Sequence, residues 1–410
     1  MNKIIPGHVG LSSERLSRIR PVMQTYVDEN TCAGVITLIA RRGQIAHWEC
    51  VGMMDIAAHK PMTPDAIFRI YSMSKPITSV ALMMLYEEGK FRLSDPISKF
   101  IPEFQDTMVF VGEAQSGVYK TDRECDITIH HLLTHTAGLS YGFEDDSPID
   151  KLYRDMFKEF NMLNEETHMI NPDAEPLEHL IPALARIPLA HQPGSAWRYS
   201  FAIDVLGYLI EMLSGERFDA FLQHRIFEPL AMVDTGFSVP EAKVERFTTM
   251  YHPGEGGGLE VADAPANSPY TQPQNFLSGG GGLVSTASDY LRFAQMLLNK
   301  GELDGVRLLS RKTVEFMTRN HLSDDVLRSS FAPIHPGYGF GLGWKVLMNV
   351  AQSGMVGSEG TFGWGGAART DFWVDPKEEL IGLFMLQLLG GKTPWLGDDF
   401  KVLTYQAIVD

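Results

Sequence analysis

The sequence predicts an α+β protein in which both ends of the chain contribute to one antiparallel β-sheet. Hairpin patterns occur near each terminus, whereas the segment between them contains helical patterns separated by Pro- and Gly-containing loops. The simplest arrangement is a discontinuous sheet domain of residues 1–92 and 237–410, flanked by N- and C-terminal helices, with a mostly helical domain of residues 93–236 inserted. We expect a functional site at the interface of the two domains.

The N-terminal part contains a helix and a hairpin. A charged segment over residues 12–26 predicts the helix. Residues 34–40 are rich in β-branched side chains, and a turn sequence at residues 41–44 separates them from a second apolar run over residues 45–50. Two such runs joined by a short turn that contains glycine are typical of an antiparallel hairpin.

The C-terminal third has a similar character. Residues 337–344 alternate glycine with large apolar side chains, which favours a strand packed closely against a neighbour. The runs 370–374 and 380–386 flank a turn sequence and predict a second hairpin, and an amphipathic helix begins at about residue 398. Within the insertion, the patterns predict helices over residues 127–135, 148–160, 177–186 and 202–214.

The composition is that of an ordinary globular protein, with 44% hydrophobic and 21% charged residues. The net charge of −16 and the pI near 5.3 disfavour nucleic acid and anionic membranes as partners. No run approaches the ~20 apolar residues of a membrane span, and the N-terminus lacks the continuous apolar segment of a secretion signal. We therefore expect a cytoplasmic protein.

Cysteine and histidine give no support for a metal site. The three cysteines, Cys32, Cys50 and Cys125, are scattered and odd in number, which excludes a fully paired disulfide framework and a cysteine-rich zinc site. His131 and His135 have the i, i+4 spacing of a zinc pair, but no Glu follows His131 as in His-Glu-x-x-His. A structural role is favoured for both, and we expect neither a metal nor another cofactor.

The most informative segment is a Ser-x-x-Lys pattern, formed by Ser72 and Lys75, at the start of a long apolar helix. Residues three apart share a helix face, so the Lys75 amine can reach the Ser72 hydroxyl and activate it. Proline is tolerated only in the first turn of a helix, so Pro76 places Ser72 at or just before the helix start. Free backbone N–H groups and the positive end of the helix dipole favour an oxyanion there.

Two distant segments complete the pattern. Residues 193–201 contain Tyr199 and lead into a predicted helix, and residues 360–368 contain the sequence Trp-Gly-Gly at 364–366. Together with Ser-x-x-Lys and the stretch His-His-Leu-Leu-Thr-His-Thr-Ala-Gly-Leu at 130–139, these segments resemble the serine β-lactamase and penicillin-binding-protein superfamily. The resemblance covers almost the whole chain and is closest to the class C-like branch, in particular the family VIII carboxylesterases. It implies a β-lactamase/transpeptidase-like fold.

The resemblance also implies roles for individual residues. Ser72 would be the nucleophile, Lys75 its partner, and Tyr199 would lie within reach of the Ser72 oxygen. An ammonium at Lys75 would favour a phenolate at Tyr199, so which of the two is the base stays open. The backbone N–H groups of Ser72 and Ala367 would form the oxyanion hole.

Two departures from the family pattern bear on the substrate. Relatives that bind β-lactams or peptide C-termini usually have Lys-Thr-Gly where this chain has Trp-Gly-Gly, and Asn where it has Phe201. Both changes remove polar groups and favour neutral esters over carboxylated amides, although Arg369 lies close in sequence and is a candidate replacement cation. The predicted substrate-binding residues are Tyr141, Phe201, Trp364, Gly365, Gly366 and Arg369.

One other pattern competes for the role of nucleophile. The segment from Gly138 to Gly142 matches the Gly-x-Ser-x-Gly of α/β-hydrolases and would make Ser140 catalytic. That nucleophile turn needs a preceding strand and a following helix, whereas a helical segment precedes Ser140 and an acidic loop follows it. We interpret the segment as a turn that lines the cleft.

The sequence therefore predicts a cofactor-free serine hydrolase that cleaves carboxylic esters with short or medium acyl chains through a Ser72 acyl-enzyme. A β-lactamase, a D-amino peptidase or an acyltransferase on the same scaffold are alternatives, as is a non-catalytic binding protein. A small-molecule ester is the expected partner. The physiological substrate, the acyl-chain preference and the oligomeric state stay open.

Overall fold

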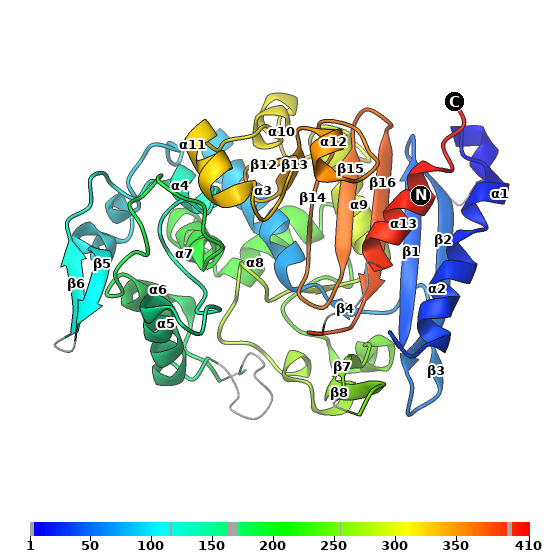
Figure 1. Ribbon diagram of the computed structural model, residues 1–410, viewed down its shortest axis with the longest axis horizontal. Coiled ribbons are helices and arrows are strands. Elements are labelled where there is room, and N and C mark those ends of the chain that lie inside the picture. Colours follow the sequence, from blue (N-terminus) through cyan, green and yellow to red (C-terminus); the bar gives the residue numbers. More distant parts are fainter. Residues whose placement is uncertain (1–3, 115–116, 163–170, 172, 255, 392–395) are drawn as a thin grey trace.

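The computed structural model describes residues 4–114, 117–162, 171, 173–254, 256–391 and 396–410. Over these residues the main sheet has eight strands in the order β12-β13-β14-β15-β16-β1-β2-β3, and all neighbours are antiparallel (Figure 1). Pairing of β1 with β16 joins the two terminal hairpins and confirms the predicted α+β fold. The strands are β1 (Gly34–Arg41), β2 (Gln44–Asp55), β3 (Lys60–Pro61), β12 (Tyr338–Phe340), β13 (Lys345–Leu347), β14 (Phe362–Gly365), β15 (Asp371–Asp375) and β16 (Leu380–Leu386).

Helices cover both faces of the sheet because side chains of successive strand residues point to opposite faces. In β1, Val35 and Ile39 belong to the cluster that includes the terminal helices α1, α2 and α13, whereas Ile36 and Leu38 belong to the larger core with α3 and α9 (Figure 1). These helices are α1 (Ser13–Leu16), α2 (Ile19–Asp28), α3 (Ser74–Glu87), α9 (Ala287–Leu298) and α13 (Leu396–Tyr405).

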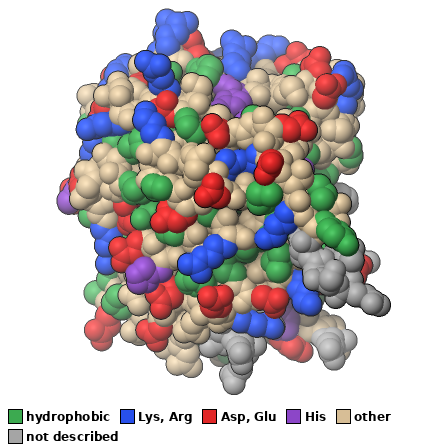
Figure 2. Space-filling model, turned by 90° about the vertical axis from the view of Figure 1, so that its left-hand side faces the viewer, with side chains coloured by type: hydrophobic (Ala, Val, Ile, Leu, Met, Phe, Trp, Pro, Cys, Tyr) green, Lys and Arg blue, Asp and Glu red, His purple; other side chains and the backbone are tan. Residues whose placement is uncertain are grey.

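The helical part of the structure lies beside the sheet, and its α7 packs against α3, α4 and α6 (Figure 1). It also contains a small hairpin, β5–β6, which the sequence patterns did not indicate. Acidic and basic side chains are interspersed over this end of the molecule (Figure 2). The domain boundaries given above stay a prediction. The elements are β5 (Val109–Ala114), β6 (Gly117–Thr121), α4 (Ile129–Leu133), α5 (Pro148–Glu159), α6 (Leu177–Leu184), α7 (Ala202–Ser214) and α8 (Phe218–Leu222).

Short elements connect the longer helices and strands along the chain. Within the described ranges, no helix has both the length and the apolar character that crossing a bilayer requires. The connecting elements are β4 (Phe68–Arg69), β7 (Met250–Pro253), β8 (Leu259–Asp263), β9 (Val284–Ser285), β10 (Glu302–Leu303), β11 (Val306–Arg307), α10 (Arg311–Met317), α11 (Asp324–Val326) and α12 (Val350–Ser353).

Two predicted elements differ from the structure. The helix predicted over residues 12–26 is two helices, α1 and α2, because Pro21 has no N–H to donate to Ser17 and its ring would clash with that carbonyl. The strand predicted over residues 337–344 is formed only by residues 338–340, which are β12, and residues 341–344 form the bend between β12 and β13. Gly343 has φ +100°, and a Cβ on it would lie 2.2 Å from Ser79 Oγ of α3. This glycine therefore serves a turn and a close approach to a helix, not a strand.

Candidate active site

Ser72 lies in a sharp turn between a short strand and a buried helix. β4 leads into the 3₁₀ turn Tyr71–Met73, and α3 follows with Pro76 in its first turn, as the sequence predicts. Tyr71 has φ 42°, a left-handed conformation that few non-glycine residues adopt, so the chain bends immediately before Ser72. The helical spacing then places Lys75 Nζ 3.2 Å from Ser72 Oγ.

The Lys75 side chain is only 1% exposed, and its ammonium group is held by oxygen atoms and aromatic rings. Besides its contact with Ser72, Nζ donates to the carbonyl oxygen of Gly280 at 2.6 Å. It also lies 4.6 Å from the centroid of the Tyr199 ring and 5.1 Å from that of Tyr141. Aromatic faces attract a cation at such distances, so Lys75 is fixed between Ser72 and Tyr199.

The Tyr199 hydroxyl contacts the motif that replaces Lys-Thr-Gly. The indole N–H of Trp364, on β14, donates to the Tyr199 hydroxyl oxygen at 3.2 Å. Tyr199 precedes α7 and its ring also packs against Tyr141, with ring centroids 5.2 Å apart. Trp364 therefore holds the phenol from one side while Lys75 faces the ring.

The end of β14 brings the backbone of Ala367 to the same place. Gly366 passes so close to the turn before Ser72 that a Cβ on it would lie 2.4 Å from the Ile70 carbonyl oxygen and 2.4 Å from Thr370 Oγ1. Only glycine fits such an approach. As a result, Ala367 and Ser72 line one cavity.

A cavity of about 310 Å³ opens at Ser72, and its wall is mostly aromatic and aliphatic. Side chains from the helical part, from the loop before β9 and from the sheet part contribute to it, which fits a site between the two parts. It is lined by Tyr71, Ser72, Lys75, Tyr141, Phe143, Phe157, Met162, Tyr199, Phe201, Phe276, Ser278, Gly280, Gly281, Ala367 and Leu389.

The predicted substrate-binding residues do not all lie in this wall. Tyr141 and Phe201 line the cavity and pack on each other, with ring centroids 4.6 Å apart. The Trp-Gly-Gly residues form the strand behind Tyr199 and the approach to Ala367. Arg369 does not line the cavity, because its Nη2 donates to the carbonyl oxygens of Gly390 and Gly391, each at 3.0 Å. No role in substrate binding follows from that position.

Sequence reasoning missed one buried acid beside the site. Asp204 of α7 is 0% exposed, and its Oδ1 accepts hydrogen bonds from Ser278 Oγ at 2.6 Å and from the Gly280 N–H at 3.1 Å. Burial raises the pKa of Asp204, while the positive charge of Lys75 and these hydrogen bonds oppose the rise. The available signal was a lone carboxylate in the apolar stretch of residues 201–210.

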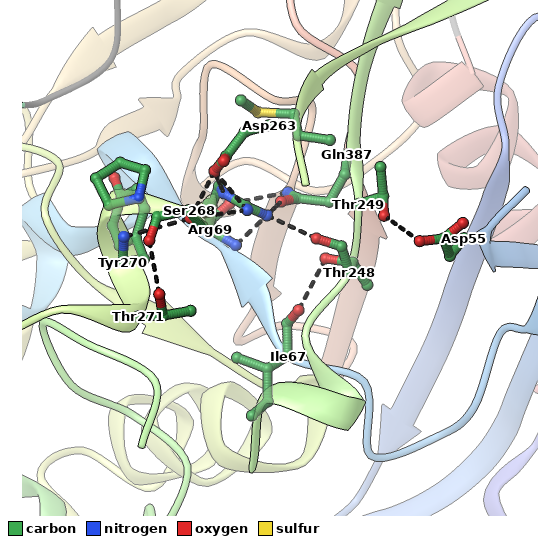
Figure 3. Close-up of polar contacts among 12 residues, drawn as sticks. Asp55, Ile67, Arg69, Thr248, Thr249, Asp263, Ser268, Tyr270, Thr271 and Gln387 are labelled. Atoms are coloured by element: carbon green, nitrogen blue, oxygen red, sulfur yellow. Dashed lines mark hydrogen bonds and ion pairs between the residues drawn. The ribbon is translucent and has the colours of Figure 1, made fainter. Parts of the chain in front are cut away.

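A buried ion pair supports the strand that leads to Ser72 (Figure 3). Arg69 of β4 is 0% exposed, and its Nε donates to Asp263 Oδ2 at 2.6 Å. The Gln387 amide binds both backbone polar groups of Arg69: Oε1 accepts from the N–H at 3.1 Å, and Nε2 donates to the carbonyl oxygen at 3.0 Å. The side chain of Gln387 thus makes the hydrogen bonds that a neighbouring strand would otherwise make, and it fixes the chain just before the turn at Ser72.

The rival motif residues have structural partners. Ser140 is buried, donates to Asp150 and accepts from Arg198 Nε at 2.9 Å, so its hydroxyl is engaged away from the cavity. His131 completes the capping of α4. His135 packs against Tyr199, with ring centroids 4.9 Å apart and the rings tilted by 49°. Among the described residues, no group of three or more His, Cys, Asp or Glu side chains is arranged to hold a metal ion.

The antiparallel sheet with its helical part, and a Ser-x-x-Lys helix start beside a tyrosine, define a serine hydrolase of the β-lactamase-like type. The chain belongs to the Beta-lactamase family, whose family model matches residues 19–405. This confirms the superfamily that the sequence motifs predict, and with it the β-lactamase/transpeptidase-like fold.

Individual relatives agree with this assignment. An uncharacterized protein of Mycobacterium tuberculosis is 37% identical over 366 residues, which are 88% of this chain and 87% of that protein. Esterase EstB of Burkholderia gladioli is 30% identical over 391 residues, 91% of this chain and 89% of EstB. Among solved structures, EstCE1, a hydrolase with promiscuous acyltransferase activity, is 27% identical with a TM-score of 0.79, covering 97% of this chain and 99% of that one.

Proposed function

We propose that the chain is an esterase that hydrolyses neutral carboxylic esters with short or medium acyl groups through an acyl-enzyme on Ser72. The observation that carries this proposal is the 3.2 Å contact between Lys75 Nζ and Ser72 Oγ at an apolar cavity. A serine hydroxyl is a weak nucleophile until a neighbouring base takes its proton. The similarity to esterase EstB over most of both chains supports the same reaction class.

The site residues account for both halves of the reaction. Ser72 Oγ attacks the ester carbonyl carbon while its proton passes to the pair formed by Lys75 and Tyr199. The backbone N–H groups of Ser72 and Ala367 stabilise the oxyanion. The pair returns the proton to the alkoxide oxygen as its bond to the carbonyl carbon breaks. Water then attacks the acyl-enzyme, loses a proton to the pair, and releases the carboxylic acid as the Ser72 hydroxyl re-forms.

The wall of the cavity favours a neutral substrate. Trp364 stands where β-lactam-binding relatives usually have lysine, and Arg369 is engaged by the carbonyl oxygens of Gly390 and Gly391. Among the described residues that line the cavity, Lys75 is the only Lys or Arg, and it already binds Ser72 and Gly280. A substrate carboxylate would be desolvated without a further cation, which is unfavourable.

The proposal is tested by Ser72→Ala. The variant should lose hydrolysis of p-nitrophenyl butyrate and keep the thermal unfolding midpoint of the native chain. A fluorophosphonate probe should label the native chain at Ser72, as located by mass spectrometry, and should not label the variant. Ester hydrolysis that survives in the variant would refute the mechanism. A chromogenic cephalosporin turned over much faster than any simple ester would instead identify a β-lactamase.

Acyl transfer to an alcohol is the second candidate. EstCE1, which shares the fold over almost the whole chain, is described as a hydrolase with promiscuous acyltransferase activity. The apolar wall around Ser72 can accept an alcohol in place of water, because both attack the same acyl-enzyme carbonyl. Adding a primary alcohol during turnover and measuring the new ester by chromatography distinguishes the two. Transfer product in excess of free acid would make transfer the main reaction.

A further inference from the structure

A buried carboxylate near Lys75, that of Asp204, has no role in the reaction proposed above. Among the described residues, no Asp or Glu lies within ion-pair distance of Lys75, although the residue is only 1% exposed. The carboxylate that faces it is Asp204, which is fully buried on α7. Asp204 itself has no salt bridge with an arginine or lysine at contact distance among those residues.

We propose that Asp204 is a positioning residue that provides the buried counter-charge of Lys75 and fixes the loop that orients its ammonium group. This inference rests on the proposed function, because it assigns a task to Asp204 in the same site. Three contacts support this proposal. Gly280 forms hydrogen bonds to both side chains, and Ser278, in the same loop, donates to Asp204. The Tyr141 hydroxyl lies beside the second oxygen of the carboxylate.

The backbone of Gly280 lies between the Lys75 ammonium and the Asp204 carboxylate and forms a hydrogen bond to each. Its carbonyl oxygen accepts from Lys75 Nζ at 2.6 Å, and its N–H donates to Asp204 Oδ1 at 3.1 Å. A Cβ on Gly280 would lie 2.5 Å from Asp204 Oδ2 and 2.6 Å from the Tyr141 hydroxyl, so the loop packs against the carboxylate with no space for a side chain. A shift of Asp204 would therefore move the carbonyl that holds Lys75.

The remaining contacts of Asp204 are also donors. Ser278 Oγ donates to Oδ1 at 2.6 Å, and the Tyr141 hydroxyl lies 3.4 Å from Oδ2. Ser278, Gly280 and Tyr141 all line the cavity at Ser72. Donors from two loops thus surround one carboxylate, and Lys75 lies on the other side of the Gly280 peptide, an arrangement that favours the ionised form of Asp204 against the cost of burial.

The electrostatic consequence can be measured. The titratable groups around Lys75 are Asp204 on α7, Tyr199 before α7, Tyr141 after α4, and His135, whose pKa burial and Lys75 together hold well below its usual range. In a poorly hydrated site an anion favours the protonated form of a neighbouring base. If Asp204 loses its charge, the pair formed by Lys75 and Tyr199 loses its proton at lower pH, whichever of the two is the base.

The test is the pH profile of Asp204→Asn, which keeps an oxygen for Ser278 and Gly280 but removes the charge. With p-nitrophenyl butyrate we expect kcat to fall about tenfold or more and KM to change less than about threefold. The acid limb of kcat/KM should move to lower pH by about one unit. The control is Ser278→Ala, which removes a hydrogen bond to the same oxygen and keeps the charge, so its acid limb should stay in place whatever its rate.

An acid limb that coincides in Asp204→Asn and the native chain, or that moves equally in Ser278→Ala, would overturn the inference. If Asp204→Asn does not fold, Asp204→Ser makes the same comparison, because water can then meet the donors of Ser278 and Gly280. The rate of fluorophosphonate labelling at Ser72, measured against pH, gives a readout that is independent of the ester. A native chain that is not labelled refutes the proposed function, whereas normal labelling with unmoved profiles refutes only the role of Asp204.

Discussion

The indole N–H of Trp364 donates a hydrogen bond to the hydroxyl oxygen of Tyr199 at 3.2 Å. Trp364 is 8% exposed and stands in the strand position where relatives that bind β-lactams usually have lysine. The substitution therefore removes a charge but keeps a donor toward the tyrosine. A donor at this oxygen stabilises a phenolate more than a phenol, since hydrogen bonds to charged groups are the stronger ones.

Trp364→Phe keeps an aromatic ring in the strand and removes the donor. We expect kcat for a p-nitrophenyl ester to fall about tenfold, because a hydrogen bond to a charged oxygen contributes about 1.5–3 kcal/mol, with a smaller change in KM. Steady-state kinetics at several pH values measure both constants. Trp344→Phe is the control, because its buried indole N–H has no partner in the described structure. Equal kcat losses in the two variants would show that the hydrogen bond plays no part.

Gly280→Ala tests the close packing behind Lys75. The new Cβ would lie 2.5 Å from Asp204 Oδ2, closer than real Cβ contacts, so the carboxylate and the loop must move apart. We expect kcat/KM to fall by about 100-fold, since displacements of about 1 Å in a catalytic group have effects of this size. Gly281→Ala is the matched control: its nearest neighbours would lie 3.8 Å away, an ordinary contact, and its loss should be much smaller.

The local part of the site could be predicted from the sequence because helix geometry fixes it. Ser72 and Lys75 are three positions apart, and Pro76 fixes the helix start, so the 3.2 Å contact follows from neighbours in the chain. The sheet could also be predicted, because hairpins at 34–50 and 370–386 have short turns and strong apolar patterns. That Tyr199 lines the same cavity as Ser72 was expected from the family resemblance, not from spacing.

The rest depends on contacts between distant segments that have no local pattern. Asp204 is important only because α7 places it beside a loop more than 70 residues further along the chain. Arg369 lies two residues after Ala367, yet a φ of 66° and the carbonyl oxygens of Gly390 and Gly391 direct its guanidinium away from the cavity. Sequence proximity to a site residue therefore does not place a side chain in the site.

Arg69→Met tests the ion pair in Figure 3. The change leaves Asp263, whose side chain is 6% exposed, buried without its cation, and removes the donors to Ser268 and Thr248. Breaking one side of a buried pair typically destabilises a protein by about 3–5 kcal/mol. Urea unfolding measures the free energy of unfolding.

Arg225→Met is the control for that experiment. Arg225 also pairs with a carboxylate, Glu88, but both side chains are more than a third exposed, and such pairs contribute about 0–1 kcal/mol. Similar free energies of unfolding for the two variants would contradict a supporting role of Arg69. A selective loss in Arg69→Met, accompanied by lower activity in the folded fraction, would connect β4 to the position of Ser72.

The histidine pair between α4 and the segment after α10 predicts how stability depends on pH. His130 Nε2 and His321 Nδ1 are 3.2 Å apart, and burial, followed by the neighbouring histidines, lowers the pKa of His130 from 6.5 to about 4. Between these values the unfolded chain binds a proton that the folded chain does not, so the free energy of unfolding falls as pH decreases from 6.5 to 4. In His130→Gln this fall should be less steep, as measured by urea unfolding at pH 7, 6 and 5. Parallel curves for His130→Gln and the native chain would show that the folded protein does not resist protonation of His130.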